Sequence, residues 1–267
     1  MNKLFINSIF FAAAVSNSVQ QAYAHDGFSK EVIEGTFEKM ELIISHGCDD
    51  NPIIAQSVLF PTLNPTLRST DSNNNPVKPP NDLSEVIDNG NLEGLVDLVQ
   101  DRSIFLDQDE KLSELSNPIG FYGKKGFLKH NLLGSVPFKF FAPFFTANTC
   151  YSKIFVETAI ADICSTKAPA IQPGKISLFI PDNGSRIGET AKANGAEHGV
   201  GEPSVLTIKR NLETNPFLDS DFNPTTACGE GINVWVTPSA EDVDKNLPIP
   251  GFWPDNKQRN HKKNNVN

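Results

Sequence analysis

Short segments rich in apolar, β-branched and aromatic residues, separated by clusters of glycine, proline and asparagine, constrain the fold of this chain most strongly. Segments of this length and composition are typical of strands joined by turns rather than of long helices. Several such strands with turn signals between them predict an all-β fold, specifically a β-sandwich. The strand-like segments are 37–44, 53–61, 151–163, 175–181, 204–208 and 232–236.

The first two of these segments flank a loop rich in turn-forming residues. Residues 46–52 read His-Gly-Cys-Asp-Asp-Asn-Pro, and a proline also ends the second segment at Pro61. Turn formers between two apolar segments are typical of a connection between neighbouring strands. The sequence therefore predicts that 37–44 and 53–61 form an antiparallel pair joined by this loop.

A small helical insertion is predicted near residues 83–116. Apolar residues recur there at helical spacing, and the pair Asn89-Gly90 interrupts the pattern, which favours two short helices over one long helix. The stretch 118–149 is dense in phenylalanine, glycine and proline and is predicted to be irregular β structure. The apolar positions of the insertion are Leu83, Val86, Ile87, Leu92, Leu95, Val96 and Val99.

Residues 1–24 have the features of a cleavable signal peptide. Lys3 supplies the positive start, an interrupted apolar stretch follows, and Ala22-Tyr23-Ala24 is a small-x-small cleavage site. The alternative is an N-terminal membrane anchor, but the apolar stretch is shorter than the roughly 20 residues that span a bilayer. We expect a mature protein that begins at His25 and is periplasmic or secreted to the cell surface. It would consist of one domain, residues 25–255, and a disordered basic tail, residues 256–267.

The charge balance excludes some partners. The chain has a formal net charge of −9, and loss of Lys3 with the signal peptide makes it −9 − 1 = −10. An acidic chain is a poor candidate for binding nucleic acid or anionic lipid, whereas it is compatible with binding cations.

Four cysteines, Cys48, Cys150, Cys164 and Cys228, follow the cleavage site. An even number in an oxidising compartment predicts two disulfides, for which three pairings are possible. Cys150 and Cys164 are close enough in sequence to close a short loop, which leaves Cys48 with Cys228. Free thiols or a thiolate metal site are the competing interpretation, although no Cys-x-x-Cys occurs.

The position of His25 is the main functional signal. After cleavage it offers an α-amine and an imidazole, which can chelate one ion together, and copper favours such nitrogen ligands. The alternative is that cleavage leaves a histidine there by chance. His46, in the loop between two strands, and His198, in a glycine-rich loop, are the candidate additional copper ligands. Trp235 or Trp253 could cover the site.

Signals for catalysis are weak. The sequence has no His-Glu-x-x-His, no Gly-x-Ser-x-Gly, no phosphate-binding loop and no glycine-rich dinucleotide motif that opens a helix. Its carboxylates form no spacing that requires acid–base chemistry. We therefore expect a binding protein rather than an enzyme.

Segments at both ends of the domain resemble the YcnI-like family of exported proteins. The resemblance rests on His25, Glu34-Gly35-Thr36, the turn 46–49, the strand ending Phe60-Pro61, and Cys-Gly-Glu-Gly-Ile-Asn-Val-Trp-Val at 228–236. It covers 25–61 and 226–238, and the middle of the chain has no recognised counterpart.

The resemblance implies an immunoglobulin-like β-sandwich that binds copper(II) through its N-terminal histidine. Carried over to this chain, it makes His25 the ligand through amine and imidazole, and it pairs Cys48 with Cys228. The family's carboxylate ligand has no assigned position here.

Three hypotheses about function follow. The first is an exported copper-binding protein, a chaperone or scavenger anchored at His25, which hands copper to a membrane or periplasmic copper-transport protein. The second is a metal-free exported structural or adhesion β-sandwich. The third is a copper-dependent oxidase with His25 and His46 on one metal, for which the sequence shows no substrate surface.

Overall fold

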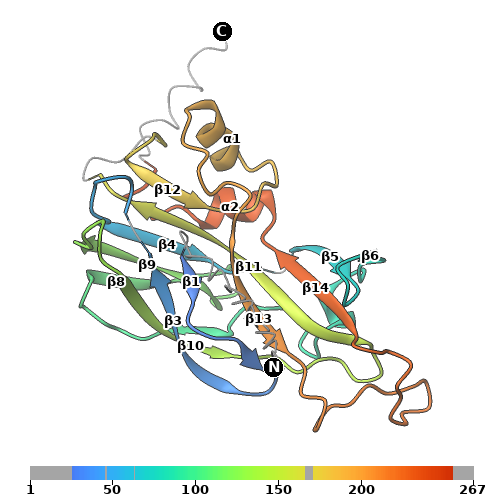
Figure 1. Ribbon diagram of the computed structural model, residues 1–267. Coiled ribbons are helices and arrows are strands. Elements are labelled where there is room, and N and C mark those ends of the chain that lie inside the picture. The colour runs from blue at the N-terminus through green and yellow to red at the C-terminus, as the bar shows by residue number, and fades with distance from the viewer. Residues whose placement is uncertain (1–25, 46, 63, 166–170, 255–267) are drawn as a thin grey trace, which may run out of the picture.

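A computed structural model describes residues 26–45, 47–62, 64–165 and 171–254. Two β-sheets face each other in it across a shared apolar interior (Figure 1). The smaller sheet has the order β1 (Gly27–Phe28), β3 (Phe37–Ile44), β10 (Gly134–Phe141) and β7 (Val96–Leu98). All its neighbouring strands are antiparallel.

The larger sheet is built around β11 (Tyr151–Ile163), which is long enough to pair with different partners along its length. Its first half pairs with β14 in parallel and with β13 in antiparallel orientation, and its second half pairs with β4 and β12. The other strands are β2 (Val32–Ile33), β4 (Ala55–Leu59), β5 (Thr66–Thr70), β6 (Pro76–Val77), β8 (Phe105–Leu112), β9 (Pro118–Gly126), β12 (Ile176–Phe179), β13 (Ser204–Lys209) and β14 (Ile232–Thr237).

The interior between the sheets is filled largely by phenylalanine rings. Phe60 and Phe138 lie 6.1 Å apart between ring centroids, and Phe121 and Phe138 lie 5.7 Å apart. Alternation places these side chains inside, because successive residues of a strand point to opposite faces of the sheet. In β3, for example, Met40, Leu42 and Ile44 are fully buried.

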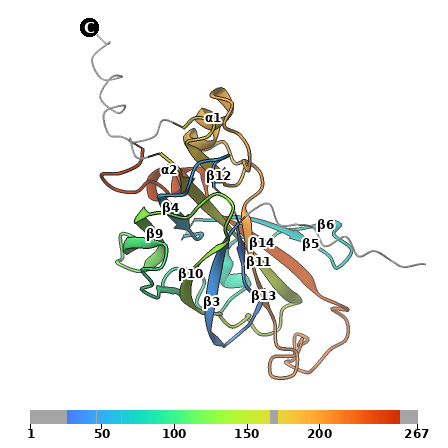
Figure 2. The same cartoon turned by 60° about the vertical axis from the view of Figure 1, so that its left-hand side comes forward.

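The opposite face of the larger sheet carries a second apolar core. Two short helices, α1 (Arg186–Ala193) and α2 (Ala240–Asn246), lie together at the end of the molecule where β4 and β12 are found (Figure 2). They pack with Trp253 over side chains such as Ala161 and Ile163 of β11. One end of the sandwich is therefore covered by a third layer.

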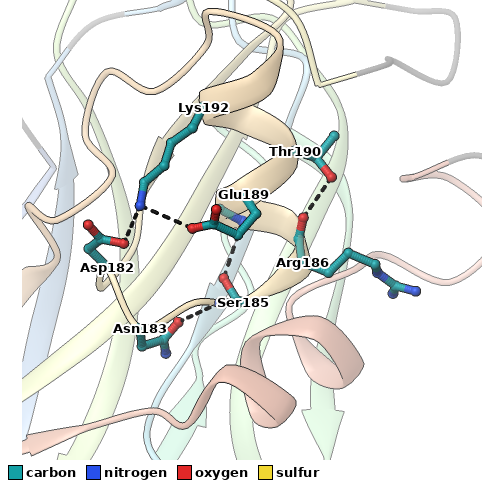
Figure 3. Close-up of polar contacts among 8 residues, drawn as sticks. Asp182, Asn183, Ser185, Arg186, Glu189, Thr190 and Lys192 are labelled. Atoms are coloured by element: carbon teal, nitrogen blue, oxygen red, sulfur yellow. Dashed lines mark hydrogen bonds and ion pairs between the residues drawn. The ribbon is translucent and has the colours of Figure 1, made fainter.

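Polar contacts fix the start of α1 (Figure 3). Ser185 caps the helix, since its hydroxyl accepts from the N–H of Gly188 at 3.2 Å. Lys192 contacts both Asp182, at 2.5 Å, and Glu189, at 3.1 Å.

The two helices are also joined to each other. The Asp244 carboxylate of α2 accepts hydrogen bonds from the N–H groups of Arg186 and Ile187, both at 2.9 Å. A negative charge at this end of α1 also complements the helix dipole. None of the helices among the described residues is long and apolar enough to cross a membrane.

The predicted fold class, all-β with a small helical part, is confirmed, but the predicted position of the helices is wrong. Residues 83–116 contain a single 3₁₀ turn, η1 (Leu83–Glu85), followed by β7 and β8. The apolar residues that suggested a helix are buried, Leu83, Val86 and Ile87 among them. A turn followed by extended chain buries them instead, because contacts with two sheets override a short periodic pattern.

The predicted pairing of 37–44 with 53–61 is also wrong. Both segments form strands, β3 and β4, but β3 lies in the smaller sheet and β4 lies in the larger one. The connection 45–54 crosses from one sheet to the other. In β4 all five residues are buried, as expected for a strand inside a large sheet with both faces covered.

The two disulfides differ from the predicted pairs. Cys48 is bonded to Cys164, and Cys150 is bonded to Cys228. The pairing of Cys150 with Cys164 is wrong because both residues flank the straight strand β11, whose 13 residues hold its two ends apart. Two disulfides indicate an oxidising, extracellular or periplasmic location.

A buried lysine on β8 contacts the end of α2. Lys111 is 7% exposed, and its ammonium donates to the carbonyls of Leu247 at 3.2 Å and Pro248 at 2.8 Å. No carboxylate among the described residues forms an ion pair with it. Burial lowers the pKa of Lys111 from 10.5 to about 7.

We expect the Lys111→Met variant to change the pH dependence of stability. Between about pH 7 and pH 10 the unfolded chain keeps the Lys111 proton and the folded chain releases it, so the free energy of unfolding rises with pH. The rise is at most about 1.4 kcal/mol per pH unit. Urea denaturation at several pH values should show it in the wild type and not in Lys111→Met.

The exposed Lys245 provides the matched control. It pairs with Glu114 at 2.6 Å on the surface, so Lys245→Met should retain the slope. An identical slope in the wild type and Lys111→Met would show that Lys111 does not change its proton affinity on folding.

Candidate metal centre

The three histidines predicted to bind copper are only partly covered by the structure. His25 and His46 lie outside the described residues, whereas His198 is described and exposed in the turn after α1. His198 lines a cavity of about 350 Å³ on whose wall Gly47, Cys48 and Asp49 also lie. The structure thus brings His198 to the turn that follows His46.

Three buried polar side chains form a cluster that includes Asp26, the residue after His25. Asp26, Gln56 and Asp162 are 3%, 1% and 0% exposed. The amide nitrogen of Gln56 donates to Asp26 Oδ2 at 2.9 Å and to Asp162 Oδ1 at 2.8 Å. Gln56 and Asp162 are opposite each other in the pairing of β4 with β11, so the sheet itself fixes this bridge.

Asp26 accepts hydrogen bonds from two other segments of the chain. Its Oδ1 accepts from the N–H of Ser45 at 3.2 Å, and its carbonyl accepts from the Ser204 hydroxyl. The antiparallel pairing of β1 with β3 also holds this part of the chain, since Gly27 pairs with Ile43. The chain is therefore anchored from its first described residue.

The two carboxyl groups strongly affect each other's protonation. Burial, and next the charge of Asp162, raises the pKa of Asp26 well above its ordinary value. Burial raises the pKa of Asp162 to about 7, which hydrogen bonds with Gln56 and Asp26 partly oppose. Two carboxylates in contact repel each other, so this pair is stable only with a shared proton or a nearby cation.

Some oxygen atoms of the cluster have no hydrogen-bond donor among the described residues. They are Oδ2 of Asp162, Oε1 of Gln56 and the hydroxyl oxygen of Ser45. Unpartnered buried acceptors are rare, because each costs about 1–3 kcal/mol of stability. Carboxylate and amide oxygens are among the donor types that bind metal cations in proteins.

The described residues do not form a complete metal site by themselves. Across 26–45, 47–62, 64–165 and 171–254, no group of three or more His, Cys, Asp or Glu side chains could hold a metal ion. A site at the cluster would need ligands from the neighbouring parts of the chain. His25 precedes Asp26 directly and His46 follows Ser45 directly.

Neither tryptophan lies over this cluster, and the predicted cover over His25 and His46 concerns residues outside those described. Trp253 belongs to the core on the opposite face of β11, and it is fully buried there. Trp235 stacks on Phe155 with ring centroids 4.3 Å apart, and the guanidinium of Arg68 lies 3.9 Å from its ring centre. It therefore stands on the face of the larger sheet that points away from the sandwich interior.

The sequence did contain a signal for Asp162 and Gln56, although neither was predicted as a site residue. Each is a polar residue within an apolar strand, in Ala-Ile-Ala-Asp-Ile and in Ala-Gln-Ser-Val-Leu. A charged side chain at a position that the strand buries needs a partner.

Comparisons with known proteins identify no relatives. No family model matches the chain, and no curated protein sequence matches it. The resemblance to the YcnI-like family remains a prediction from the sequence.

Proposed function

We propose that this is an exported protein that binds copper(II) at its mature N-terminus, with His25 as the anchor ligand. One observation carries the proposal: Asp26 and Ser45 are hydrogen-bonded to each other beside the buried carboxyl group of Asp162. His25 and His46 are the chain neighbours of these two bonded residues. In this proposal these two candidate nitrogen ligands share one ion with the carboxylate of Asp162, whose Oδ2 has no hydrogen-bond donor among the described residues.

Each group has a distinct role in this proposal. The α-amine and imidazole of His25 chelate the ion, and the imidazole of His46 is the candidate third nitrogen ligand. The carboxyl group of Asp162 supplies negative charge, which offsets the positive charge that copper brings into a buried place. His198, on the wall of the cavity beside Gly47, is the remaining candidate ligand.

The role supported by these residues is binding rather than catalysis. We propose copper handling, as a chaperone or scavenger that passes the ion to a copper-transport protein. The alternative is a metal-free structural or adhesion β-sandwich, in which the Asp26 cluster serves only to anchor the N-terminal strand.

We expect copper(II) titration of the protein that begins at His25 to show tight one-to-one binding. One extra glycine before His25 converts its amine into an amide and removes a ligand while leaving every side chain in place. The affinity should fall by at least about 100-fold, because losing an outer-shell partner alone costs about 10- to 100-fold. Competition with a chelator of known affinity measures the change, and the electron paramagnetic resonance spectrum reports the nitrogen ligands.

Single substitutions measure the contribution of each side chain to copper binding. His46→Gln and Asp162→Asn should each weaken copper binding, whereas His261→Gln, in the C-terminal tail, should leave it unchanged. Equal affinity of the glycine-extended protein would contradict the proposal and favour the metal-free alternative.

A further inference from the structure

The loop between β9 and β10 exposes three large apolar side chains within seven residues. Phe127, Leu132 and Leu133 are 67%, 50% and 73% exposed. Single exposed apolar residues are normal on protein surfaces, but a group of them marks an interaction site.

The base of this loop is firmly held, so its apolar side chains cannot fold back into the core. Leu128 is buried, and its N–H and carbonyl both bond to Ile53, at 3.0 and 2.9 Å. At the other end a Cβ on Gly134 would lie 2.5 Å from the Ile104 side chain and 2.8 Å from the Leu128 side chain, so a larger residue there would displace both. The interior is already filled beneath the loop.

Basic residues flank these apolar side chains in the sequence. Segment 124–133 reads Lys-Lys-Gly-Phe-Leu-Lys-His-Asn-Leu-Leu and contains no acidic residue. Lys124 and Lys125 share Asp107, at 3.5 and 3.4 Å. Lys129 and Arg102, on the adjoining loop that bonds to Phe127, form no ion pair with any described residue.

We propose that this loop, residues 127–133, binds the surface of a lipid bilayer that contains anionic headgroups. Phe127, Leu132 and Leu133 enter the boundary between headgroups and acyl chains, and the lysines remain among the lipid phosphates. Apolar side chains combined with basic residues are the features that bind interfacial segments to membranes. Basic residues near such a surface add electrostatic attraction to the anionic headgroups.

The size of the surface favours a membrane over a second protein molecule. A stable protein interface buries about 800 Å² on each partner and needs matching shapes. Three side chains of one loop provide only a fraction of that area. A bilayer needs no matching shape, because lipids rearrange around an inserted side chain.

The acidic character of the whole chain is compatible with this surface. A net charge of −9 disfavours general attraction to anionic lipid, but charges act over only about 8–10 Å at physiological salt. The anionic headgroups repel the acidic remainder of the protein surface and attract the basic loop. The protein should therefore bind in one orientation.

The loop also lies beside the turn that begins at Gly47. A Cβ on Gly47 would lie 3.4 Å from the Cα of His130, so the loop packs against the turn that follows His46. The membrane proposal does not depend on copper binding, and it is tested on the metal-free protein.

The test is flotation of the purified exported protein with vesicles of phosphatidylcholine alone or with phosphatidylglycerol. We expect binding to the mixed vesicles that weakens with added salt. The Phe127→Ser/Leu133→Ser variant should reduce the partition coefficient at least ten-fold, and Lys129→Glu should reduce it several-fold. Leu115→Ser, which alters a 66%-exposed leucine in another loop, is the matched control and should bind like the wild type.

Three outcomes would overturn the proposal. The wild type could fail to bind either vesicle, or Leu115→Ser could lose as much binding as the loop variant. The third is a dimer in analytical ultracentrifugation that Phe127→Ser/Leu133→Ser abolishes, which would assign the loop to a second copy of the chain. Unchanged circular dichroism and melting temperature of each variant establish that it is folded.

Discussion

Replacing both Cys48 and Cys164 by alanine should lower the free energy of unfolding by about 4–5 kcal/mol. The bond connects residues 116 positions apart, so its loss releases a long loop in the unfolded chain. Both cysteines are also buried, at 2% and 8% exposure, so the change removes packed atoms from the core between the sheets. Denaturation with guanidinium chloride measures the loss.

The second disulfide is the control for this prediction. Cys150 and Cys228 are 78 positions apart and more exposed, so the Cys150→Ala/Cys228→Ala variant should lose less stability. Equal losses in the two variants would mean that the position of Cys48 in the core adds nothing. Peptide mapping of the unreduced protein should recover Cys48 with Cys164.

Arg210→Ala should lower the free energy of unfolding by about 3–5 kcal/mol, the range for breaking a buried charge network. Arg210 is 6% exposed and donates to several carbonyls, including those of Thr149 at 3.0 Å and Asn215 at 2.8 Å. Burial lowers the pKa of Arg210, and the nearby charge of Glu34 partly opposes this shift. Loss of the guanidinium leaves these carbonyls without that donor and removes the positive charge near the Glu34 carboxylate.

Glu34 is the acidic member of the hydrogen-bond network around Arg210. It is 4% exposed and accepts from the N–H groups of Phe145 at 2.7 Å and Asn211 at 2.6 Å. Arg210→Lys keeps the charge but cannot reach as many carbonyls, so it should restore less than half of the lost stability. Hydrogen exchange should localise the effect to the 210–231 region. Full recovery by lysine would show that charge alone matters.

The sequence was sufficient to locate six of the fourteen strands among the described residues, but not to pair them. The six are β3, β4, β11, β12, β13 and β14. Alternation in Ser204–Lys209 and the apolar run in Tyr151–Ile163 are local properties, and both segments are strands. Which strands become neighbours depends on contacts between distant segments. β4 is buried on both faces, so its burial pattern gives no single core-facing side from which its sheet could be inferred.

Helices were harder to predict because they are short. α2 has seven residues, and its best local signal is Ser239 followed three residues later by Asp242, whose N–H the serine hydroxyl accepts. In 83–99 the spacing suggested helices where tertiary contacts formed a turn and a strand. In a short segment, a few apolar residues can match both the helical pattern and the strand pattern.

The candidate site was also only partly predictable from local sequence. The sequence pointed to His25 and His46 through their positions along the chain, but the Asp26–Gln56–Asp162 cluster arises from β4 lying beside β11. Asp162 follows Gln56 by more than one hundred residues, so no local pattern could connect them.

The two disulfides alternate along the chain, because Cys150 lies between Cys48 and Cys164 while Cys164 lies between Cys150 and Cys228. When such a chain enters an oxidising compartment N-terminus first, Cys48 meets Cys150 before Cys164 has arrived. Oxidation in order of arrival would thus join Cys48 to Cys150 and Cys164 to Cys228, and neither is a native bond. Correct maturation requires that oxidation wait for β11 to join β4, or that thiol–disulfide exchange reshuffle the first bonds.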